Sequence, residues 1–250
     1  MENINRVIEG DNCEVMRQWQ DECIDLVVTS PPYDDLRTYG GHDWDFYGVA
    51  WNLKRLLKPG GVLVWVVTDQ TKDGNETGTS MRQALHFQSV GLNLHDTMVY
   101  QVAGTGAKGS NSAYWQEWEY CFVLSKGAPK SFSPIGNGKL TTSGGERRKA
   151  TGEVKEARLR QQNEGRPGNV WRYAVGQDST GHPAQFPEKL AKDHVLSWSN
   201  KGDLVLDPFA GSGTTLKAAK ELGRKFIGIE VNPEYVEICN RRIAQEVLAL

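Results

Sequence analysis

The 250-residue sequence lacks the long apolar run that a membrane-spanning helix needs, and its first residues form neither a basic nor an apolar leader. Its four cysteines, Cys13, Cys23, Cys121 and Cys239, form no CxxC pair and have no histidine at metal-site spacing. We therefore expect a soluble, cytoplasmic protein with reduced thiols and no bound metal.

With 38% hydrophobic residues, the chain is long enough to bury one sizeable core. Short apolar runs alternate with amphipathic stretches along most of it. We expect strands at 4–9, 24–29, 62–68, 92–102, 119–125, 203–207 and 225–230, and helices at 12–21, 44–57, 80–89, 188–199, 214–222 and from 233 onward. This alternation is typical of an α/β protein with a mainly parallel sheet and helices on both faces.

The net charge of −2 conceals an uneven distribution. Residues 1–50 hold eleven acidic and three basic side chains, whereas residues 137–172 hold nine basic and four acidic ones. Residues 127–170 are rich in glycine and charge and poor in apolar residues, so we expect an insert between two halves of one domain, 1–126 and 171–250. Such a basic segment is either a solvated loop or a phosphate-binding segment.

The stretch Thr29-Ser30-Pro31-Pro32-Tyr33 follows the apolar run of the second expected strand. Two consecutive prolines fix φ and lack N–H donors, so the preceding carbonyls are held rigidly outside a strand ladder. Tyr33 can stack on a planar base, while Ser30 Oγ and the Pro31 carbonyl accept the hydrogens of its amino group. The pattern predicts a catalytic site at Ser30, Pro31, Pro32 and Tyr33; taken alone, it equally fits a polyproline turn.

A second loop, Asp207-Pro208-Phe209-Ala210-Gly211-Ser212-Gly213-Thr214, lies between an expected strand and an expected helix. It lacks the third glycine of the dinucleotide fingerprint and the Gly-Lys-Ser/Thr of a P-loop. Gly211 and Gly213 let the backbone approach a ligand, and the helix start offers N–H groups to a carboxylate. Asp207 and Glu230 each close a strand and suit an ammonium group and ribose hydroxyls. S-adenosylmethionine carries all of these groups; the alternative is a capping acid with packing glycines.

These two motifs resemble the catalytic and cofactor motifs of the DNA amino-methyltransferases, which act on adenine N6 or cytosine N4. The catalytic motif precedes the cofactor motif here, as in the β group of that family. Gly10-Asp11 is similar to the strand-end acid near the cofactor adenine, Glu117–Lys126 to the strand before the target-recognition region, and His182–Leu190 to the segment that touches the methionine end. The cofactor site implied by the resemblance comprises Asp11, His182, Asp207, Phe209, Ala210, Gly211, Ser212, Gly213, Thr214 and Glu230.

The resemblance also implies an architecture, a Rossmann-like methyltransferase sheet of seven strands, circularly permuted so that the chain starts in the middle of the sheet. It identifies the basic insert as the target-recognition region, which favours double-stranded DNA as the substrate. The DNA-contacting residues expected in it are Arg147, Arg148, Lys149, Arg158 and Arg160. The target base would rotate out of the duplex onto Tyr33, because its amino nitrogen is not accessible inside the stack. The host would be a bacterial or phage-infected cell.

The first position of the catalytic motif is Ser30, where the adenine enzymes of this family usually carry Asp and less often Asn. A hydroxyl both donates and accepts, so it can bond ring N3 or the amine of cytosine. The resemblance therefore favours cytosine N4 over adenine N6, although Ser30 can also accept from adenine N6. Trp115 and Trp118 are candidates for the base pocket, but large aromatic residues beside a strand more often belong to the core.

Three other functions compete with this interpretation. Cytosine C5 methylation needs a cysteine nucleophile, and none of the four cysteines follows a proline. A protein or RNA amino-methyltransferase shares the proline-containing floor, but the motif order favours DNA. A non-catalytic nucleic-acid-binding module would not need an intact Ser30, Tyr33, Asp207, Gly211 and Glu230. Expected partners are DNA and a cognate restriction nuclease, and the chain is expected to be a monomer or a homodimer.

Overall fold

The computed structural model describes residues 4–33, 44–103, 114, 116–135, 168–174 and 187–244. The elements in chain order are β1 (Arg6–Glu9), α1 (Asn12–Arg17), β2 (Ile24–Thr29), α2 (Phe46–Leu56), β3 (Leu57–Val67), β4 (Thr71–Lys72), β5 (Asn75–Glu76), α3 (Thr79–Ser89), β6 (Asn93–Ala103), β7 (Trp118–Ser125), β8 (Val170–Ala174), α4 (Glu188–Trp198), β9 (Leu204–Asp207), α5 (Thr214–Glu221), β10 (Lys225–Glu230) and α6 (Pro233–Ala244). This is the α/β class that the alternating pattern predicts.

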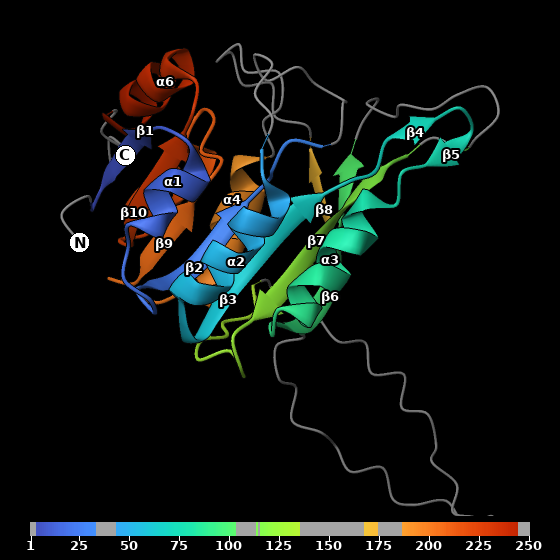
Figure 1. Ribbon diagram of the computed structural model, residues 1–250, viewed down its shortest axis with the longest axis horizontal. Coiled ribbons are helices and arrows are strands. Elements are labelled where there is room, and N and C mark those ends of the chain that lie inside the picture. The colour runs from blue at the N-terminus through green and yellow to red at the C-terminus, as the bar shows by residue number, and fades with distance from the viewer. Residues whose placement is uncertain are drawn as a thin grey trace, which may run out of the picture. The chain divides into compact units, whose positions relative to one another are not determined.

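A single mixed sheet of eight strands in the order β1-β10-β9-β2-β3-β7-β6-β8 dominates the molecule (Figure 1). The first five strands of that order run parallel to one another, and β7 runs antiparallel to both β3 and β6. We expected seven strands; the eighth, β8, adds a parallel edge strand beside β6. The sequence pattern missed it because a short edge strand of aromatic and charged residues shows no clear apolar alternation.

The chain starts at one edge of the sheet, not in its middle as the resemblance implied. β1 is an edge strand whose neighbour is β10, near the other end of the sequence (Figure 1). The permutation instead places β9 and β10, the last strands made, between β1 and the central strand β2. The two predicted motifs therefore come from adjacent strands, since β2 pairs directly with β9.

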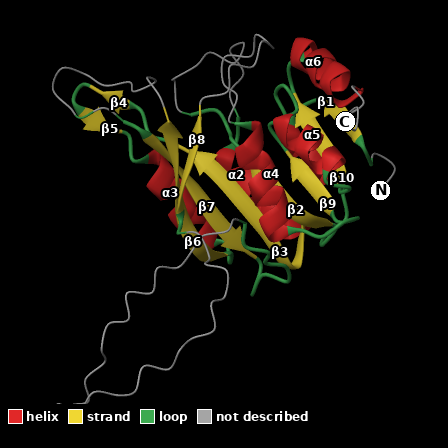
Figure 2. Cartoon of the chain, turned by 180° about the vertical axis from the view of Figure 1, so that it is seen from behind, coloured by secondary structure: helices red, strands yellow, loops and turns green. Residues whose placement is uncertain are grey.

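The described helices cover both faces of the sheet. Helices α1, α2 and α3 lie on the face toward the viewer in Figure 1, and α4 and α5 lie on the opposite face in Figure 2. Both faces of the central strands are buried, and all six residues of β2 are buried. Strands covered on both faces are typically continuous apolar runs, which is why the alternating pattern of a half-exposed strand is missing here.

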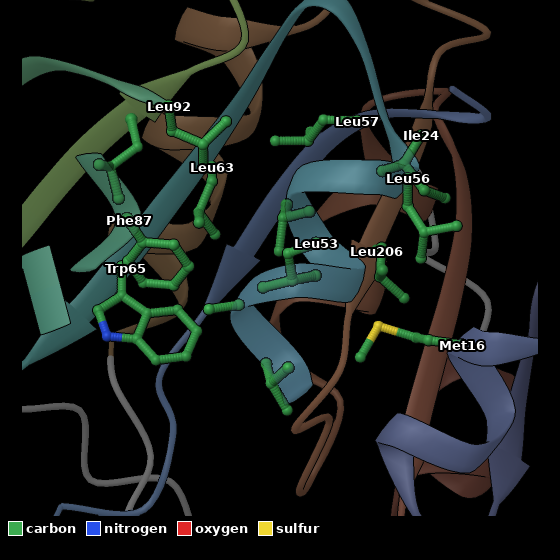
Figure 3. Close-up of a cluster of buried hydrophobic side chains, with 14 of the residues drawn as sticks. Met16, Ile24, Leu53, Leu56, Leu57, Leu63, Trp65, Phe87, Leu92 and Leu206 are labelled. Carbon is green, nitrogen blue, oxygen red and sulfur yellow. The ribbon is translucent and has the colours of Figure 1, made fainter. Parts of the chain in front are cut away.

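The side chains of the sheet divide into two cores, one under each layer of helices. The first core includes Met16, Leu53, Trp65 and Phe87, with the Trp65 ring centred 5.0 Å from that of Phe87 (Figure 3). Trp65 is fully buried, and its indole N–H donates to Gln83 Oε1 at 2.8 Å, so its polar atom is satisfied. The second core packs α4, α5 and Cys239 of α6 against the other face.

Several boundaries differ from the expected ones. β3 begins at Leu57 because Leu57 already pairs with Ile24, five residues before the apolar run that marked the strand. The hairpin β4–β5 was missed, although its Asp73-Gly74 turn, with φ of 51° and 76°, is a hairpin signal. Its strands have two residues each and are wholly exposed, so no hydrophobic pattern marks them.

The contacts divide the chain into one unit of Met1–Ser133 with Asn169–Leu250 and a second unit, Pro134–Gly168. Residues 136–167 lie outside the described ranges, so the target-recognition insert stays a prediction. Among the described helices, none is both long and apolar enough to cross a membrane. In the same part of the chain, no group of three or more His, Cys, Asp or Glu side chains is placed to hold a metal ion.

Candidate functional site

The site is built at the edge of the sheet where the parallel strands end. Because β1, β10, β9, β2 and β3 are parallel, their carboxyl ends lie along one edge. β7 is antiparallel, so its first residues reach the same edge. β9 connects onward to β10 on one side and β2 to β3 on the other, which makes the boundary between β9 and β2 a topological switch point. Ligands of open α/β sheets bind at such a point.

Asp207 at the end of β9 connects the two predicted motifs. Its Oδ1 accepts a 2.7 Å hydrogen bond from Thr29 Oγ1 and a 3.1 Å bond from the Phe209 N–H. The Asp207 side chain is only 2% exposed. Burial raises its pKa to about 6, with a further contribution from Glu230, although its hydrogen bonds to Thr29 and to the Phe209 N–H lower it. Asp207 is thus a buried carboxyl group whose ionised form is less favoured than that of a solvent-exposed Asp side chain.

Glu230 at the end of β10 lies across the glycine loop. Its Oε2 accepts a 2.8 Å hydrogen bond from the Gly211 N–H, and its Oε1 accepts a 2.9 Å bond from the Asn232 N–H. Both carboxylate oxygens are therefore oriented by backbone donors. Gly211 and Gly213 have φ of +49° and +81°, which only glycine adopts without strain.

Helix α5 starts directly after Gly213, and no side chain caps its first turn. The N-terminal N–H groups of a helix have no intrahelical partner and attract a negative charge. Ser212 and Thr214 flank the helix start and are buried. The donor set of this loop, uncapped N–H groups beside two strand-end carboxylates, fits a ligand with a carboxylate, an ammonium group and a ribose.

Arg242 of α6, which the sequence analysis missed, holds this loop through side-chain hydrogen bonds. Its Nη1 donates to Ser212 Oγ and to Thr214 Oγ1, each at 3.1 Å, and its Nη2 lies 3.4 Å from Glu188 Oε2. The Arg242 side chain is 7% exposed. It lies three residues after buried Cys239, so the periodicity of the helix was a signal that this arginine faces inward. A buried guanidinium holding two hydroxyls fixes the loop geometry.

The turn after β1 also supports the cofactor loop. The Gly10 N–H donates to the Glu230 carbonyl at 3.0 Å, and Asn12 Nδ2 donates to the Pro208 carbonyl at 3.1 Å. Asp11 is exposed, and its Oδ1 caps α1 by accepting the Glu14 N–H at 2.9 Å. Asp11 thus follows directly after the residue that bonds the Glu230 backbone, and its predicted role in cofactor binding stays a prediction.

Phe209 anchors the loop in the aromatic part of the first core. Its ring is partly buried, with its centroid 5.0 Å from Trp44 and 6.3 Å from Trp65 in edge-on geometry. Ala210 is buried under the loop against the second core. The loop is thus held by both cores, which fixes the glycines between them.

The catalytic motif continues from β2 and reaches the first residues of β7. Pro31 is buried, while Ser30, Pro32 and Tyr33 are half-buried. Ser30 Oγ lies 2.7 Å from the Tyr33 hydroxyl, which donates to Glu119 Oε2 at 2.9 Å. Burial, together with the charge of Glu119, raises the pKa of Tyr33 well above its usual value of 10, so this phenol stays protonated.

Glu119 is the second residue that the sequence analysis missed as part of the site. It is the second residue of β7, and only the antiparallel run of that strand brings it to this edge. Trp118 beside it is 37% exposed and packs edge-on against Tyr120 at 4.7 Å, so it is not a core residue. Trp115, His182, Arg147, Arg148, Lys149, Arg158 and Arg160 lie outside the described residues.

The sequence profile of a family described as DNA methylase, N6_N4_Mtase, matches residues 24–241. The chain is 47% identical over 242 residues to the orphan methyltransferase M.BamHII of Bacillus amyloliquefaciens, covering 90% of each protein. It is 30% identical over 253 residues to the DNA adenine methyltransferase YhdJ of Escherichia coli, covering 95% of this chain and 82% of the relative.

The solved structures show the same architecture. The PvuII DNA methyltransferase, which is specific for cytosine N4, superimposes with a TM-score of 0.74 at 23% identity, covering 97% of this chain and 87% of that one. At that identity the likeness shows the fold alone. Other solved neighbours include complexes with S-adenosylmethionine.

Proposed function

Because the chain belongs to the N6/N4 DNA methylase family, we propose that it methylates the N4 nitrogen of a flipped cytosine in double-stranded DNA. DNA is its substrate and S-adenosylmethionine its methyl donor. The observation that carries the proposal is the joining of the two motifs, in which Thr29, directly before Ser30, donates to Asp207 of the cofactor loop.

The residues present fit S-adenosylmethionine. The uncapped first turn of α5 suits its carboxylate, and Glu230, held by two backbone N–H groups, suits the ribose hydroxyls. Asp207 suits the ammonium group through its buried carboxylate, and Asp11, which follows the Gly10 bonded to the Glu230 carbonyl, is proposed for the cofactor adenine. Phe209, Ala210, Gly211, Ser212, Gly213 and Thr214 form the loop, and His182 completes the proposed set at the methionine end. When bound, the cofactor supplies an electrophilic methyl group.

The chain holds the target amine against that methyl group. Tyr33 offers a ring face for the base, and Ser30 Oγ with the Pro31 carbonyl accepts hydrogens of the amine, which localises the nitrogen lone pair. Pro31 and Pro32 keep the backbone of this floor rigid. The rate then comes mainly from alignment of the two reactants, with no covalent enzyme intermediate.

Cytosine is preferred over adenine because Ser30 stands where the adenine enzymes of this family usually carry Asp. Of the two bonds expected of the Ser30 hydroxyl, to ring N3 and to the amine, its contacts favour the second. The Ser30 hydroxyl is engaged with Tyr33, so it is an acceptor for the amine and not a donor to ring N3. The preference therefore depends on the motif position of Ser30, and adenine N6 is the second candidate, as in the relative YhdJ.

The basic insert, 127–170, is the proposed target-recognition region, with Arg147, Arg148, Lys149, Arg158 and Arg160 on phosphates or bases. Replacing one side chain that contacts a phosphate should reduce the slope of log K against log[salt] for DNA binding by about one. A cognate restriction nuclease is a proposed cellular partner, and the proposed assembly is a monomer or a homodimer.

Product analysis tests the function. The protein is incubated with unmethylated DNA and labelled S-adenosylmethionine, the DNA is digested to nucleosides, and the product is identified by mass. N4-methyldeoxycytidine is the expected product. N6-methyldeoxyadenosine would overturn the base assignment but keep the mechanism. If the protein binds the cofactor but transfers no label to any of several DNAs of different sequence, the proposed function is overturned.

A further inference from the structure

We propose that Glu119 is the final acceptor of a proton relay that removes the proton from the methylated amine through Ser30 and Tyr33. The relay goes beyond the proposed function but rests on it, because it needs an amino group held at Ser30. Glu119 would act through two other side chains, so its role is to receive the proton and to set the direction of the hydrogen bonds.

The direction follows from the number of protons. A phenol has one hydrogen to donate, and Tyr33 gives it to Glu119 Oε2 at 2.9 Å. The 2.7 Å contact between Ser30 Oγ and the Tyr33 oxygen must then be donated by Ser30. Ser30 has no second hydrogen, so its remaining lone pairs can only accept. Glu119 thereby makes Ser30 an acceptor at the place where the amine must lie.

The proton balance of the reaction matches this chain. The amine nitrogen forms a bond to the methyl carbon as the carbon–sulfur bond breaks, and the electron pair of that bond remains on sulfur. The nitrogen becomes cationic and strongly acidic. Its proton passes to Ser30 Oγ while Ser30 gives its own to Tyr33 and Tyr33 gives its own to Glu119. The base leaves as a neutral methylamine, and Glu119 holds the proton until it exchanges with water.

The surroundings favour a concerted transfer. Pro31 and Pro32 carry no polar side-chain atom, so within the motif Ser30–Tyr33 only the two hydroxyls can pass a proton. Burial keeps the pKa of Tyr33 well above 10, which excludes a stable tyrosinate and requires the phenol to receive one proton as it releases the other. Chains of hydrogen bonds polarise one another, so a carboxylate at the end strengthens the basicity of Ser30 Oγ.

Glu119→Gln is the decisive variant, because the amide oxygen still accepts from Tyr33 but cannot take up a proton. With saturating cofactor and DNA, we expect its single-turnover rate to fall by about 100-fold or more, as for loss of a general base. Glu117→Gln, a neighbouring exposed glutamate, is the matched control and should leave the rate unchanged. An unchanged rate in Glu119→Gln overturns the relay.

Two further measurements separate proton transfer from a structural role. Acetate should restore part of the rate of Glu119→Ala, with chloride as the ionic-strength control, because a small carboxylate can occupy the space and accept the proton. Absence of rescue would count against the relay. Tyr33→Phe keeps the ring but breaks the chain, so adding Glu119→Gln to it should cost nothing further. Additive losses would show that Glu119 acts independently of Tyr33, which also overturns the relay.

Three controls distinguish failure of the relay from misfolding of a variant and from failure of the proposed function. If Glu119→Gln does not fold, Tyr33→Phe alone decides, since a wild-type rate in that variant excludes the relay. Cofactor binding by each variant verifies an intact loop. Failure of the wild-type protein to produce any methylated deoxynucleoside refutes the proposed function, whereas a methylating wild type with an equally active Glu119→Gln refutes only the relay.

Discussion

Thr29 and Asp207 are 178 positions apart in the chain, and Thr29 Oγ1 donates a 2.7 Å hydrogen bond to Asp207 Oδ1. Thr29 ends β2 immediately before the catalytic motif, and Asp207 begins the cofactor loop. Both side chains are buried, so water does not compete for this bond. The bond therefore fixes the position of the catalytic motif relative to the cofactor loop. Substitution of Asp207 tests how this residue contributes to both.

Asp207→Asn should weaken cofactor binding by at least about tenfold, or 1.4 kcal/mol. The amide oxygen can still accept from Thr29 and Phe209, but the charge that attracts a cationic cofactor is lost. The thermal stability of the ligand-free variant at pH 7.5 should not fall, because a neutral buried group costs less than a charged one. Calorimetric titration and melting curves measure both quantities. A large fall in melting temperature would show that the charge is needed for the fold.

The pH dependence of cofactor binding follows from the same group. The pKa of Asp207 in the folded protein is about 6, above the value of 3.8 for a free Asp side chain, so folding takes up a proton between about pH 4 and 6. The Asp207 contribution to ligand-free stability therefore falls as pH rises through that window. Cofactor affinity should rise over the upper part of it, as the carboxylate ionises. The difference between the wild type and Asp207→Asn, in stability and in cofactor affinity at each pH, isolates the contribution of this carboxyl group. Equal pH profiles for the two proteins would exclude both effects.

Arg242→Gln should weaken cofactor binding about five- to tenfold, because Ser212 and Thr214 lose their shared donor. Glu188 still pairs with Lys192 and Lys217, so most of the fold should survive. Arg241→Gln is the matched control, since Arg241 is the exposed neighbour on the same helix. Equal cofactor affinities for the two variants would remove Arg242 from the site.

Gly213→Ala should destabilise the protein by about 2–4 kcal/mol. An added Cβ would lie 2.4 Å from Cys239 Sγ, and the φ of +81° is strained for alanine. Gly74→Ala is the matched control, because Gly74 has a φ of +76° with nothing within 4 Å, so it measures strain alone. Adding Cys239→Ala to Gly213→Ala should relieve the clash but not the strain; urea denaturation of the set tests this. Strict additivity would argue against contact between the two residues.

Asp25→Asn should lower the free energy of unfolding by about 2–4 kcal/mol at neutral pH. Asp25 is 3% exposed, pairs with Lys58 at 2.8 Å and with Lys130, and accepts the Leu204 N–H at 2.9 Å. Burial alone would raise its pKa, but the Leu204 N–H and the two lysines lower it below 3.8. Its stabilisation is therefore present above about pH 4 and lost as pH falls through the folded pKa. Asp21→Asn, at an exposed ion pair, should change stability by less than about 0.5 kcal/mol.

Local patterns predicted the elements best where the middle of the strand is buried. β2 and β10 have the expected bounds, because their apolar runs are flanked by polar residues at both ends. The N-terminal features of α6 were also predictable, since Asn232 Oδ1 accepts the Glu234 N–H beside Pro233. The order of strands was not predictable from the chain, because pairing between strands far apart in sequence leaves no local signal.

The same distinction applies to the site. Ser30 and Asp207 lie in short, recognisable motifs, whereas Glu119 and Arg242 enter through an antiparallel strand and a terminal helix. Nothing in the residues beside Glu119 marks it as a partner of Tyr33, 86 positions away. The sequence motifs therefore include the residues proposed to touch the ligands but not Glu119 and Arg242, which bond those residues from elsewhere in the fold.

The pairing of β1 with β10 has a consequence for synthesis of the protein. Residues Arg6 to Glu9 are synthesised long before their neighbours in the sheet, Ile227 to Glu230. Glu230, which orients the glycine loop, belongs to that late strand. A nascent chain thus carries Ser30 and Tyr33 through most of translation without a completed cofactor site. The cofactor site can therefore assemble only after β10 has been synthesised and has paired with β1.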